Sequence, residues 1–301
     1  MQKTLISIIG STGIGKTKLA IEIAKHFGTE IISCDSRQFF KEMKIGTATP
    51  TDEELAQAKH HFIGHLSVQD YYSIGQYEED ALEKIEEIFE KNDFAVLVGG
   101  SMMYEKAVVE GLNDLPEANA ENQEKLQKIL DEEGLEKLQE ILKNLDEEYY
   151  NVVHKENPRR LLRAIDVIWQ TGRKYSEIIA EPKHKRDFKV IRIGITAPRE
   201  IMYERINLRV DKMLEKGLID EVKSLTKYQN FVPLQTVGYT EIFKYLEGTW
   251  DLDFAVEEIK KNSRRYAKRQ ETWNRKVENV TWLPYDYSEE QLHEILSKIE
   301  K

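Results

Sequence analysis

The residues near the amino terminus combine glycines, a lysine and a threonine at the spacing of a phosphate-binding loop. Residues 10–17 read Gly-Ser-Thr-Gly-Ile-Gly-Lys-Thr, which fits G-x-x-x-x-G-K-[ST]. Glycines let the backbone curl, so that several N–H groups can point at one anion. Lys16 supplies a mobile cation, and the Thr17 hydroxyl can bind Mg²⁺. The motif predicts a site for a phosphate-bearing ligand, but it does not decide whether that ligand is a nucleotide.

A carboxylate follows the next strand that the sequence predicts. Residues 30–34, Glu-Ile-Ile-Ser-Cys, predict a short strand that ends at Asp35-Ser36-Arg37-Gln38. In parallel α/β sheets, ligands bind at the carboxyl ends of the strands. We therefore expect Asp35 to lie near the phosphates held by the first loop.

The flanking segments have the patterns needed to position these groups. An apolar, β-branched run at residues 5–9 predicts a strand before the loop, and residues 19, 23 and 27 repeat at helical spacing after it. Residues 94–98 are apolar throughout, as in a strand buried on both faces. That strand ends in Gly-Gly-Ser rather than in an aspartate, and no N-K-x-D pattern follows. Both features argue against an ATP-driven motor and a GTP switch.

The middle of the chain changes character and contains only helical patterns. Residues 117–148 hold eleven acidic and four basic side chains, whereas residues 155–192 hold eleven basic and five acidic ones. A helix beginning at Pro158 places its arginines on one face. This face is either merely solvated or, since arginine suits phosphate recognition, a contact for nucleic acid. Residues 260–276 hold eight basic side chains, one acidic side chain and two interleaved aromatics. This segment too either packs its aromatics inward or contacts nucleic acid.

The composition of the chain limits the classes of ligand, metal site and cellular location that fit it. The chain has 301 residues, of which 40% are hydrophobic, and a net charge of −10, which disfavours general attraction to nucleic acid or membranes. A single cysteine, Cys34, excludes an internal disulfide and a cysteine-cluster zinc site. His60, His61 and His65 are better explained as ordinary loop or core histidines than as metal ligands. Without a signal peptide or a membrane-length apolar run, we expect a cytoplasmic, monomeric protein that does not contact membranes.

Seven motifs occur in an order that resembles the bacterial tRNA dimethylallyltransferase family, also called tRNA isopentenyltransferases. They lie at residues 10–17, 35–38, 45–50, 99–104, 205–210, 237–239 and 265–270. The resemblance covers nearly the whole chain. It implies an α/β fold with a P-loop NTPase-like parallel sheet core flanked by helices, formed by residues 1–115 and 187–301. It also implies an all-helical insertion domain at residues 116–186 that contacts the anticodon stem-loop.

The resemblance also implies a reaction and its partners. A dimethylallyl group passes from dimethylallyl diphosphate to the N6 amine of the adenosine 3′-adjacent to the anticodon in certain tRNAs. The phosphate loop then holds a diphosphate leaving group rather than ATP, which fits the missing aspartate after residues 94–98. Mg²⁺ is the expected cofactor, with Thr17 as its ligand. The partners are tRNA and dimethylallyl diphosphate.

Roles follow residue by residue from the same resemblance. The expected catalytic residues are Asp35 as general base, Thr12, Ser101 and Arg209. The diphosphate-binding residues are Gly10, Ser11, Thr12, Gly13, Ile14, Gly15, Lys16 and Thr17. The tRNA-binding residues are Asp35, Ser36, Arg37, Gln38, Ser101, Gln123, Arg159, Arg160, Leu161, Leu162 and Arg163. The chain departs from the usual family pattern by having Ser11 for proline, Gly13 for alanine and Ser101 for threonine, and Gln123 stands where some members have arginine.

Three other classes compete with this interpretation. A small-molecule kinase of the phosphate-loop class would need ATP and an adenine-binding lid, for which the sequence shows no motif. An adenylate isopentenyltransferase acting on free nucleotides would need neither the helical insert nor the basic carboxyl-terminal helix. A non-enzymatic RNA-binding module would not need a complete phosphate loop.

Overall fold

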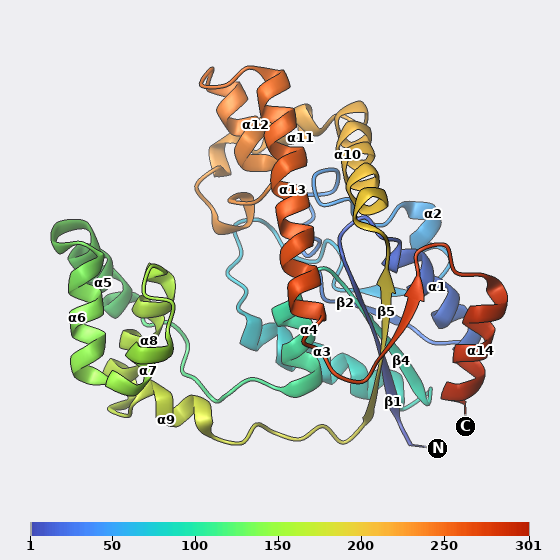
Figure 1. Ribbon diagram of the computed structural model, residues 1–301, viewed down its shortest axis with the longest axis horizontal. Coiled ribbons are helices and arrows are strands. Elements are labelled where there is room, and N and C mark those ends of the chain that lie inside the picture. Colours follow the sequence, from blue (N-terminus) through green and yellow to red (C-terminus); the bar gives the residue numbers. More distant parts are fainter. Residues whose placement is uncertain (1, 301) are drawn as a thin grey trace. The chain divides into compact units, whose positions relative to one another are not determined.

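The computed structural model describes residues 2–300 and contains one six-stranded sheet in the order β3-β2-β4-β1-β5-β6. All five neighbouring pairs are parallel. The strands are β1 (Thr4–Gly10), β2 (Ile31–Ser33), β3 (His60–His61), β4 (Phe94–Val98), β5 (Lys189–Thr196) and β6 (Val280–Pro284). Figure 1 shows the three central strands β4, β1 and β5 side by side.

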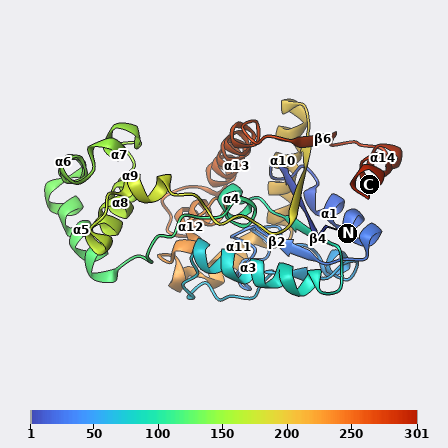
Figure 2. The ribbon, with the colours of Figure 1, turned by 90° about the horizontal axis from the view of Figure 1, so that it is seen from below.

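Helices surround the sheet on both faces. Those of the sheet-containing part are α1 (Lys16–Phe27), α2 (Asp52–Leu55), α3 (Ile74–Phe89), α4 (Met102–Glu110), α10 (Arg199–Glu215), α11 (Leu218–Ser224), α12 (Tyr239–Leu246), α13 (Leu252–Asn274) and α14 (Glu289–Ile299). Apolar side chains of α1 and α14 pack on one face of the sheet, whereas those of α3 and α4 pack on the other. Figure 2 shows α1 and α14 together at the same side of the strands.

The apolar sequence of β4 follows from this double covering. Ala95 and Leu97 pack with the α3 side, whereas Phe94, Val96 and Val98 pack with the α1 side. Every residue of β4 is buried. A strand covered by helices on both faces needs apolar residues at consecutive positions rather than at alternate ones.

The parallel arrangement gathers three loops at one edge of the sheet. The segments after β1, β2 and β4 all leave the carboxyl ends of neighbouring strands. The loops after β2 and β4 lie in contact, because a Cβ atom built on Gly99 would be 2.4 Å from the carbonyl carbon of Cys34. Glycine at position 99 is therefore required for Asp35 and Ser101 to approach each other.

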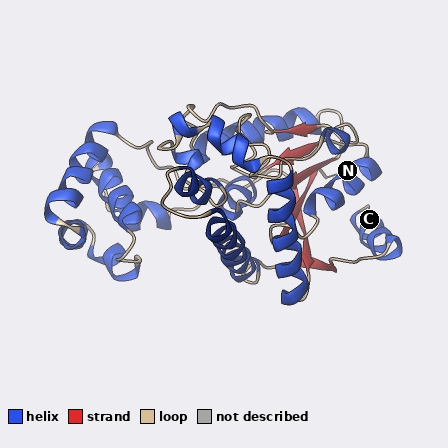
Figure 3. Ribbon diagram, turned by 90° about the horizontal axis from the view of Figure 1, so that it is seen from above, coloured by secondary structure: helices blue, strands red, loops and turns tan. Residues whose placement is uncertain are grey.

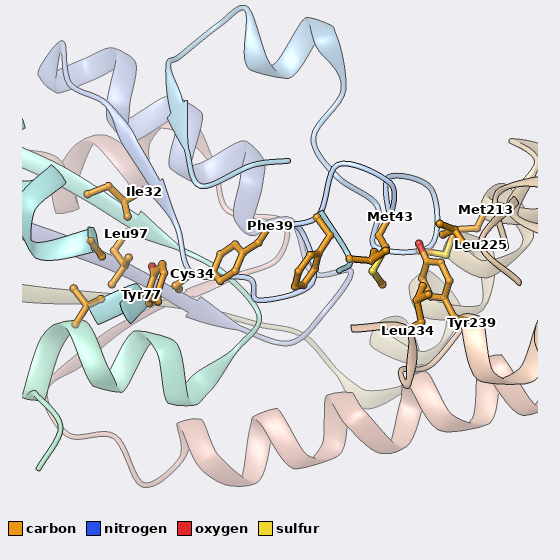
Figure 4. Packing of buried hydrophobic residues seen from close by; sticks show 14 of the residues in the cluster. Ile32, Cys34, Phe39, Met43, Tyr77, Leu97, Met213, Leu225, Leu234 and Tyr239 are labelled. Carbon is orange, nitrogen blue, oxygen red and sulfur yellow. The ribbon is translucent and has the colours of Figure 1, made fainter. Parts of the chain in front are cut away.

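A continuous apolar core links the sheet to the helices that follow β5. Figure 4 shows buried side chains running from the sheet through the loop after β2 to the helices near residue 239: Ile32, Leu97, Cys34, Tyr77, Phe39, Met43 and Tyr239. Tyr239 on α12 is fully buried against Met43 and Leu234 in this cluster. The loop after β2 is thus held between the sheet and the helices α10–α13.

The chain divides into two compact units, residues 1–109 with 186–301, and residues 110–185. The second unit begins six residues before the boundary expected at 116, because α4 ends at Glu110 and the chain leaves the sheet unit there. It contains α5 (Ala120–Glu133), α6 (Leu135–Leu145), α7 (Glu147–Val152), α8 (Pro158–Thr171) and α9 (Tyr175–Ala180). Figure 3 shows helices and no strand in this described segment.

The helical unit has its own core and its own buried polar network. Its apolar core includes Leu126, Leu142 and Leu161. Asp166 of α8 is fully buried, and its carboxylate accepts hydrogen bonds from Asn122, Arg163 and Gln170. A buried carboxylate is stable only with such partners, so these contacts fix α5 against α8.

Most of the predicted elements are present, with two local differences. The expected strands at residues 5–9 and 94–98 and the parallel sheet are confirmed, and β6 is an edge strand. β2 is shorter than predicted, and the two-residue strand β3 was not predicted. α11 ends at Ser224, and the chain continues as a 3₁₀ turn, since the Ser224 and Thr226 hydroxyls bond to backbone carbonyls three residues earlier. Over residues 2–300, no helix has the length and apolar character needed to cross a membrane.

Candidate functional site

The loop after β1 wraps around the amino-terminal end of α1. Gly15 immediately precedes α1 with φ of 114°, a backbone conformation that side-chain-bearing residues rarely adopt. No side chain caps this helix, so the N–H groups of its first turn are not covered by a capping group. Such a helix start attracts anions through its N–H groups and its partial positive charge.

Lys16 points back into its own loop. Its Nζ atom donates hydrogen bonds to the carbonyl oxygens of Gly10 at 3.0 Å and Ser11 at 2.9 Å. Burial lowers the pKa of Lys16 to about 8, while Asp35 opposes this shift and Arg209 adds to it. The ammonium group of Lys16 therefore lies beside the position at which the loop would bind an anion.

The two threonine hydroxyls of the loop have no partner among residues 2–300. Thr12 and Thr17 both line the same cleft. The Thr12 backbone N–H is taken by Gln270, whereas its hydroxyl makes no hydrogen bond to a described residue. The Thr17 hydroxyl is an oxygen ligand of the kind that Mg²⁺ prefers, and Mg²⁺ needs few protein ligands when phosphate and water supply the rest. The Thr17 hydroxyl is therefore available as a single protein ligand for a cation in the cleft.

Asp35 opens onto the same cleft as the phosphate loop. The cleft has a volume of about 860 Å³ and is lined by Lys16, Thr17, Asp35 and Ser101, among others. One carboxylate oxygen of Asp35 accepts a hydrogen bond from the Arg37 backbone N–H at 3.2 Å. The carboxylate and the anion cradle thus face one shared space, as the sequence predicts from parallel strands, although β4 lies between β1 and β2 in the sheet.

The residues after Asp35 are held by two neighbouring loops. Ser101 Oγ accepts the backbone N–H of Ser36 at 3.0 Å and lies 2.9 Å from Ser36 Oγ. The Gln38 amide donates to the carbonyl oxygens of Thr47 and Ala48, each at 3.3 Å. Ser36, Arg37, Gln38 and Ser101 all line the cleft. The Gln38 amide is thus directed into loop 44–49.

Arg209 reaches the site from α10. Its guanidinium donates to the Thr47 carbonyl oxygen at 3.0 Å, and it lines the cleft. Burial lowers the pKa of Arg209, and the negative charge of Asp35 partly offsets this effect. An arginine remains charged in any case, so Arg209 adds a fixed positive charge to the cleft. Arg205, one turn earlier, donates to the Gly13 carbonyl oxygen at 3.0 Å.

Loop 44–49 is itself fixed by one carboxylate. Glu221 accepts hydrogen bonds from the backbone N–H groups of residues 44, 45 and 46 at 3.0, 2.7 and 2.9 Å. The Tyr239 hydroxyl donates to the same carboxylate at 2.7 Å. A Cβ atom on Gly46 would lie 2.5 Å from the Tyr239 ring. Glu221 and Tyr239 therefore set the position of the carbonyl groups that hold Gln38 and Arg209.

The expectations for the helical insert need correction at several positions. Leu161 and Leu162 are buried in the apolar core of this unit, so their side chains pack inward rather than toward RNA. Arg163 is bound to Asp166 and to the Pro116 carbonyl oxygen. Arg159 and Arg160 are exposed on the first turn of α8. The predicted arginine face is thus reduced to these two side chains, and Gln123 lies partly exposed on α5.

A second basic surface lies on α13. A groove of about 400 Å³ there is lined by Arg265, Lys268, Arg269, Thr272, Trp273 and Lys276. The Lys106 ammonium group lies 5.6 Å from the centre of the Trp273 ring. Four of the eight basic side chains of residues 260–276 and one of the two aromatics thus line this groove, whereas Tyr266 lines the cleft.

The three histidines considered as metal ligands have other contacts. His60 Nδ1 lies 2.7 Å from the Ala58 carbonyl oxygen, and His61 Nε2 lies 2.5 Å from Glu30 Oε2. His65 packs against Phe39, Phe62 and Tyr72. Within the part of the chain that the structure describes, no group of three or more histidine, cysteine or acidic side chains could hold a metal ion.

Three residues of the site received no role from the sequence. Gln270 and Tyr266 line the cleft from α13, and Glu221 fixes loop 44–49. Gln270 and Tyr266 belong to one of the seven recognised motifs and are four residues apart, hence on one helix face. That spacing could have indicated a shared contact, whereas nothing in the sequence indicated the partner of Glu221.

Comparison with known proteins identifies the family. A sequence model described as IPP transferase matches residues 38–277. The chain is 49% identical over 300 residues to a tRNA dimethylallyltransferase of Christiangramia forsetii, with 99% of each chain covered. It is 46% identical over 298 residues to tRNA dimethylallyltransferase 1 of Bacteroides fragilis, covering 99% of this chain and 98% of the relative.

Solved structures agree with the sequence relatives. The tRNA isopentenylpyrophosphate transferase of Bacillus halodurans has 35% identity and a TM-score of 0.73, with 99% of this chain and 96% of that chain covered. A eukaryotic dimethylallyltransferase acting on tRNA has 26% identity and a TM-score of 0.86, with 98% and 79% covered. Both share the P-loop NTPase-like α/β fold. The chain therefore belongs to the IPP transferase family.

Proposed function

We propose that this enzyme transfers a dimethylallyl group from dimethylallyl diphosphate to the N6 amine of the adenosine 3′-adjacent to the anticodon in certain tRNAs. Membership of the IPP transferase family supports the reaction class. One structural observation carries the proposal. The phosphate loop and the Asp35 carboxylate open onto the same cleft of about 860 Å³. A single cavity can therefore serve the leaving diphosphate and the attacking amine together.

Asp35 is the proposed general base. An adenine amine is a weak nucleophile because its lone pair is delocalised into the ring. The nitrogen forms a bond to the first carbon of the dimethylallyl group while the bond from that carbon to the diphosphate oxygen breaks. The amine proton passes to the Asp35 carboxylate.

The phosphate loop and two cations stabilise the departing diphosphate. The helix start, Lys16 and Arg209 together provide N–H groups and positive charge where the leaving group gains negative charge. Thr17 is the proposed protein ligand of Mg²⁺, which would supply further charge neutralisation when bound. Two of the three N–H donors of Lys16 bond to the Gly10 and Ser11 carbonyl oxygens, which leaves one for the diphosphate.

The other wall of the cleft is proposed to receive the adenosine. The target base lies in the anticodon loop and must leave its stack to enter a pocket. Ser101 lies beside Asp35 in the cleft wall, and its hydroxyl is proposed to contact the base. Ser36, Arg37 and Gln38 line the cleft next to it. The Thr12 hydroxyl, in the phosphate loop, is proposed to contact the diphosphate.

Two basic surfaces are proposed to contact the tRNA backbone. Arg159 and Arg160 are exposed on the helical unit, and the groove on α13 combines four cationic side chains with Trp273. Phosphate contacts of this kind provide salt-dependent affinity, and aromatic rings can stack on unpaired bases. The proposal includes a monomeric enzyme in the cytoplasm, as the sequence leads us to expect.

One assay separates this proposal from action on free nucleotides. The full chain is incubated with dimethylallyl diphosphate labelled in its prenyl group, Mg²⁺ and either bulk tRNA or AMP. We expect label in tRNA and none in AMP. Label in AMP alone would instead favour adenylate isopentenyl transfer, and label in neither would reject the proposal.

A further inference from the structure

Gln270 joins two of the loops that form the cleft. It lies on α13 and is 1% exposed. Its Oε1 atom accepts the backbone N–H of Thr12 at 2.8 Å, and its Nε2 atom donates to the Gly100 carbonyl oxygen at 2.8 Å. Because one partner is a donor and the other an acceptor, the amide has only one orientation that satisfies both.

The Gly100 carbonyl group is held twice by α13. The Tyr266 hydroxyl, one helical turn before Gln270, donates to the same oxygen at 2.8 Å. Burial raises the pKa of Tyr266 to about 12, with a further contribution from Asp35, so the hydroxyl stays a donor near neutral pH. The loop after β4 is thus fixed to α13 through a single carbonyl oxygen.

The Asp35 carboxylate packs at the same place. A Cβ atom built on Gly100 would lie 2.9 Å from Asp35 Oδ2 and 3.3 Å from Gln270 Nε2. The carboxylate and the amide therefore lie beside one another against the bare Cα of residue 100. The side chain of Gln270 links Thr12 to Gly100. It consequently also fixes the position of Asp35 relative to the phosphate loop.

We propose that Gln270 is a positioning residue that sets the separation between the diphosphate-binding loop and Asp35. This inference rests on the proposed function. Two properties of glutamine are needed. Its length spans Thr12 and Gly100, and its neutral amide adds no second negative charge beside the carboxylate that must accept a proton.

The charges around Asp35 make the second property measurable. Among the described residues, the titratable groups that interact with Asp35 include Lys16 on α1, Arg209 on α10, Tyr266 on α13 and the adjoining Cys34. Replacing Gln270 by glutamate adds a like charge to this set with almost no change of shape, and it also removes the hydrogen bond to the Gly100 carbonyl oxygen. A carboxylate beside another carboxylate binds its proton more tightly.

The first test removes the contact without adding charge. Gln270→Met keeps the length of the side chain and loses both hydrogen bonds. We expect kcat to fall about 10²-fold, as for a displacement of about 1 Å between reacting groups, while KM for tRNA and for dimethylallyl diphosphate changes by less than about threefold. A purely structural role would instead lower the melting temperature and leave kcat per folded molecule unchanged.

The second test uses the pH–rate profile. Gln270→Glu still accepts the Thr12 N–H, and we expect the acidic limb of kcat to move upward by at least about one pH unit. Gln57→Glu is the control, because Gln57 is exposed outside the cleft and the change in charge is the same. If the Gln270→Met variant unfolds at the assay temperature, the acidic limb of kcat in the Gln270→Glu variant alone tests the role of Gln270.

The outcomes distinguish this inference from the proposed function. Wild-type protein that labels no tRNA would reject the function itself. The role of Gln270 alone would be rejected by a different pattern. The wild type would be active, the Gln270→Glu variant would keep the wild-type acidic limb of kcat, and any folded Gln270→Met variant would keep the wild-type kcat.

Discussion

The Nζ atom of Lys16 lies 2.9 Å from the carbonyl oxygen of Ser11, within the loop proposed to bind diphosphate. Two of the three N–H donors of this lysine bond to backbone carbonyl groups of the loop. Burial lowers the pKa of this ammonium group to about 8. In molecules whose Lys16 is deprotonated, diphosphate binding should return the proton to Lys16, because a nearby anion favours the charged form of the lysine.

The first prediction is that diphosphate binding takes up protons near pH 8. With the pKa of free Lys16 at about 8, roughly half of the molecules lack the proton at that pH. Binding of inorganic pyrophosphate should therefore take up about half a proton per site, and affinity should fall as the pH rises above 8. Calorimetry in two buffers of different ionisation enthalpy measures this uptake.

The control for this measurement is Lys16→Arg. Arginine keeps the positive charge and stays protonated across this pH range, so its variant should show no uptake from this position. Equal uptake by the wild type and the arginine variant would assign the proton to another group and contradict the prediction.

The second prediction concerns Asp35. Asp35→Asn removes the proton acceptor and keeps the shape of the side chain. Transfer of the prenyl group should fall by about 10²- to 10⁴-fold, while tRNA affinity stays within a few-fold of wild type. Single-turnover kinetics and filter binding give the two quantities, with the exposed Asp253→Asn on α13 as the control. Near-normal turnover of Asp35→Asn would remove the residue from its proposed role.

The third prediction concerns the helical unit. Arg160 is exposed on α8, so Arg160→Ala should weaken tRNA binding and reduce the slope of log affinity against log salt by about one unit. Binding of dimethylallyl diphosphate should not change. Lys128→Ala is the control, because Lys128 is an exposed cation on the same unit and lies 3.9 Å from Glu132. Equal weakening of both ligands by Arg160→Ala would contradict a separate RNA contact.

The fourth prediction concerns the carboxylate that fixes loop 44–49. Glu221→Gln replaces an acceptor of four hydrogen bonds by an amide whose NH₂ group must face donors. We expect the free energy of unfolding to fall by about 1–3 kcal/mol. Because Thr47 and Arg209 share a hydrogen bond, diphosphate affinity should fall as well.

Two further variants serve as a control and as an independent test of this fourth prediction. Asp220→Asn removes an exposed charge from the same helix and should have neither effect. Gly46→Ala should reproduce both effects without changing charge, since its Cβ would lie 2.5 Å from the Tyr239 ring. Stability and affinity unchanged in Glu221→Gln would show that the loop does not depend on this carboxylate.

The elements that the sequence predicted well are those whose pattern is local. The phosphate loop needs glycines, Lys16 and Thr17 within eight residues, and the buried strand β4 needs five consecutive apolar residues. Both conditions can be recognised in the sequence alone. The placement of Asp35 beside the loop also followed, because parallel strands bring their carboxyl ends to one edge.

The features that the sequence did not predict depend on contacts between distant segments. Gln270 meets Thr12 across 258 positions, and Glu221 meets loop 44–49 across about 175 positions. The arginine face of α8 was overestimated for a related reason. Helical spacing places Arg163 near Arg159 and Arg160, but only packing shows that Arg163 is bound to the buried Asp166.

The most direct measurement is a crystal structure of the full chain with an anticodon stem-loop and an unreactive analogue of dimethylallyl diphosphate. The proposed mechanism predicts the diphosphate against Lys16 and a carboxylate oxygen of Asp35 within about 3.2 Å of the N6 atom of the extruded adenosine. An adenosine whose N6 atom is directed away from Asp35, or a diphosphate bound outside the loop, would contradict it.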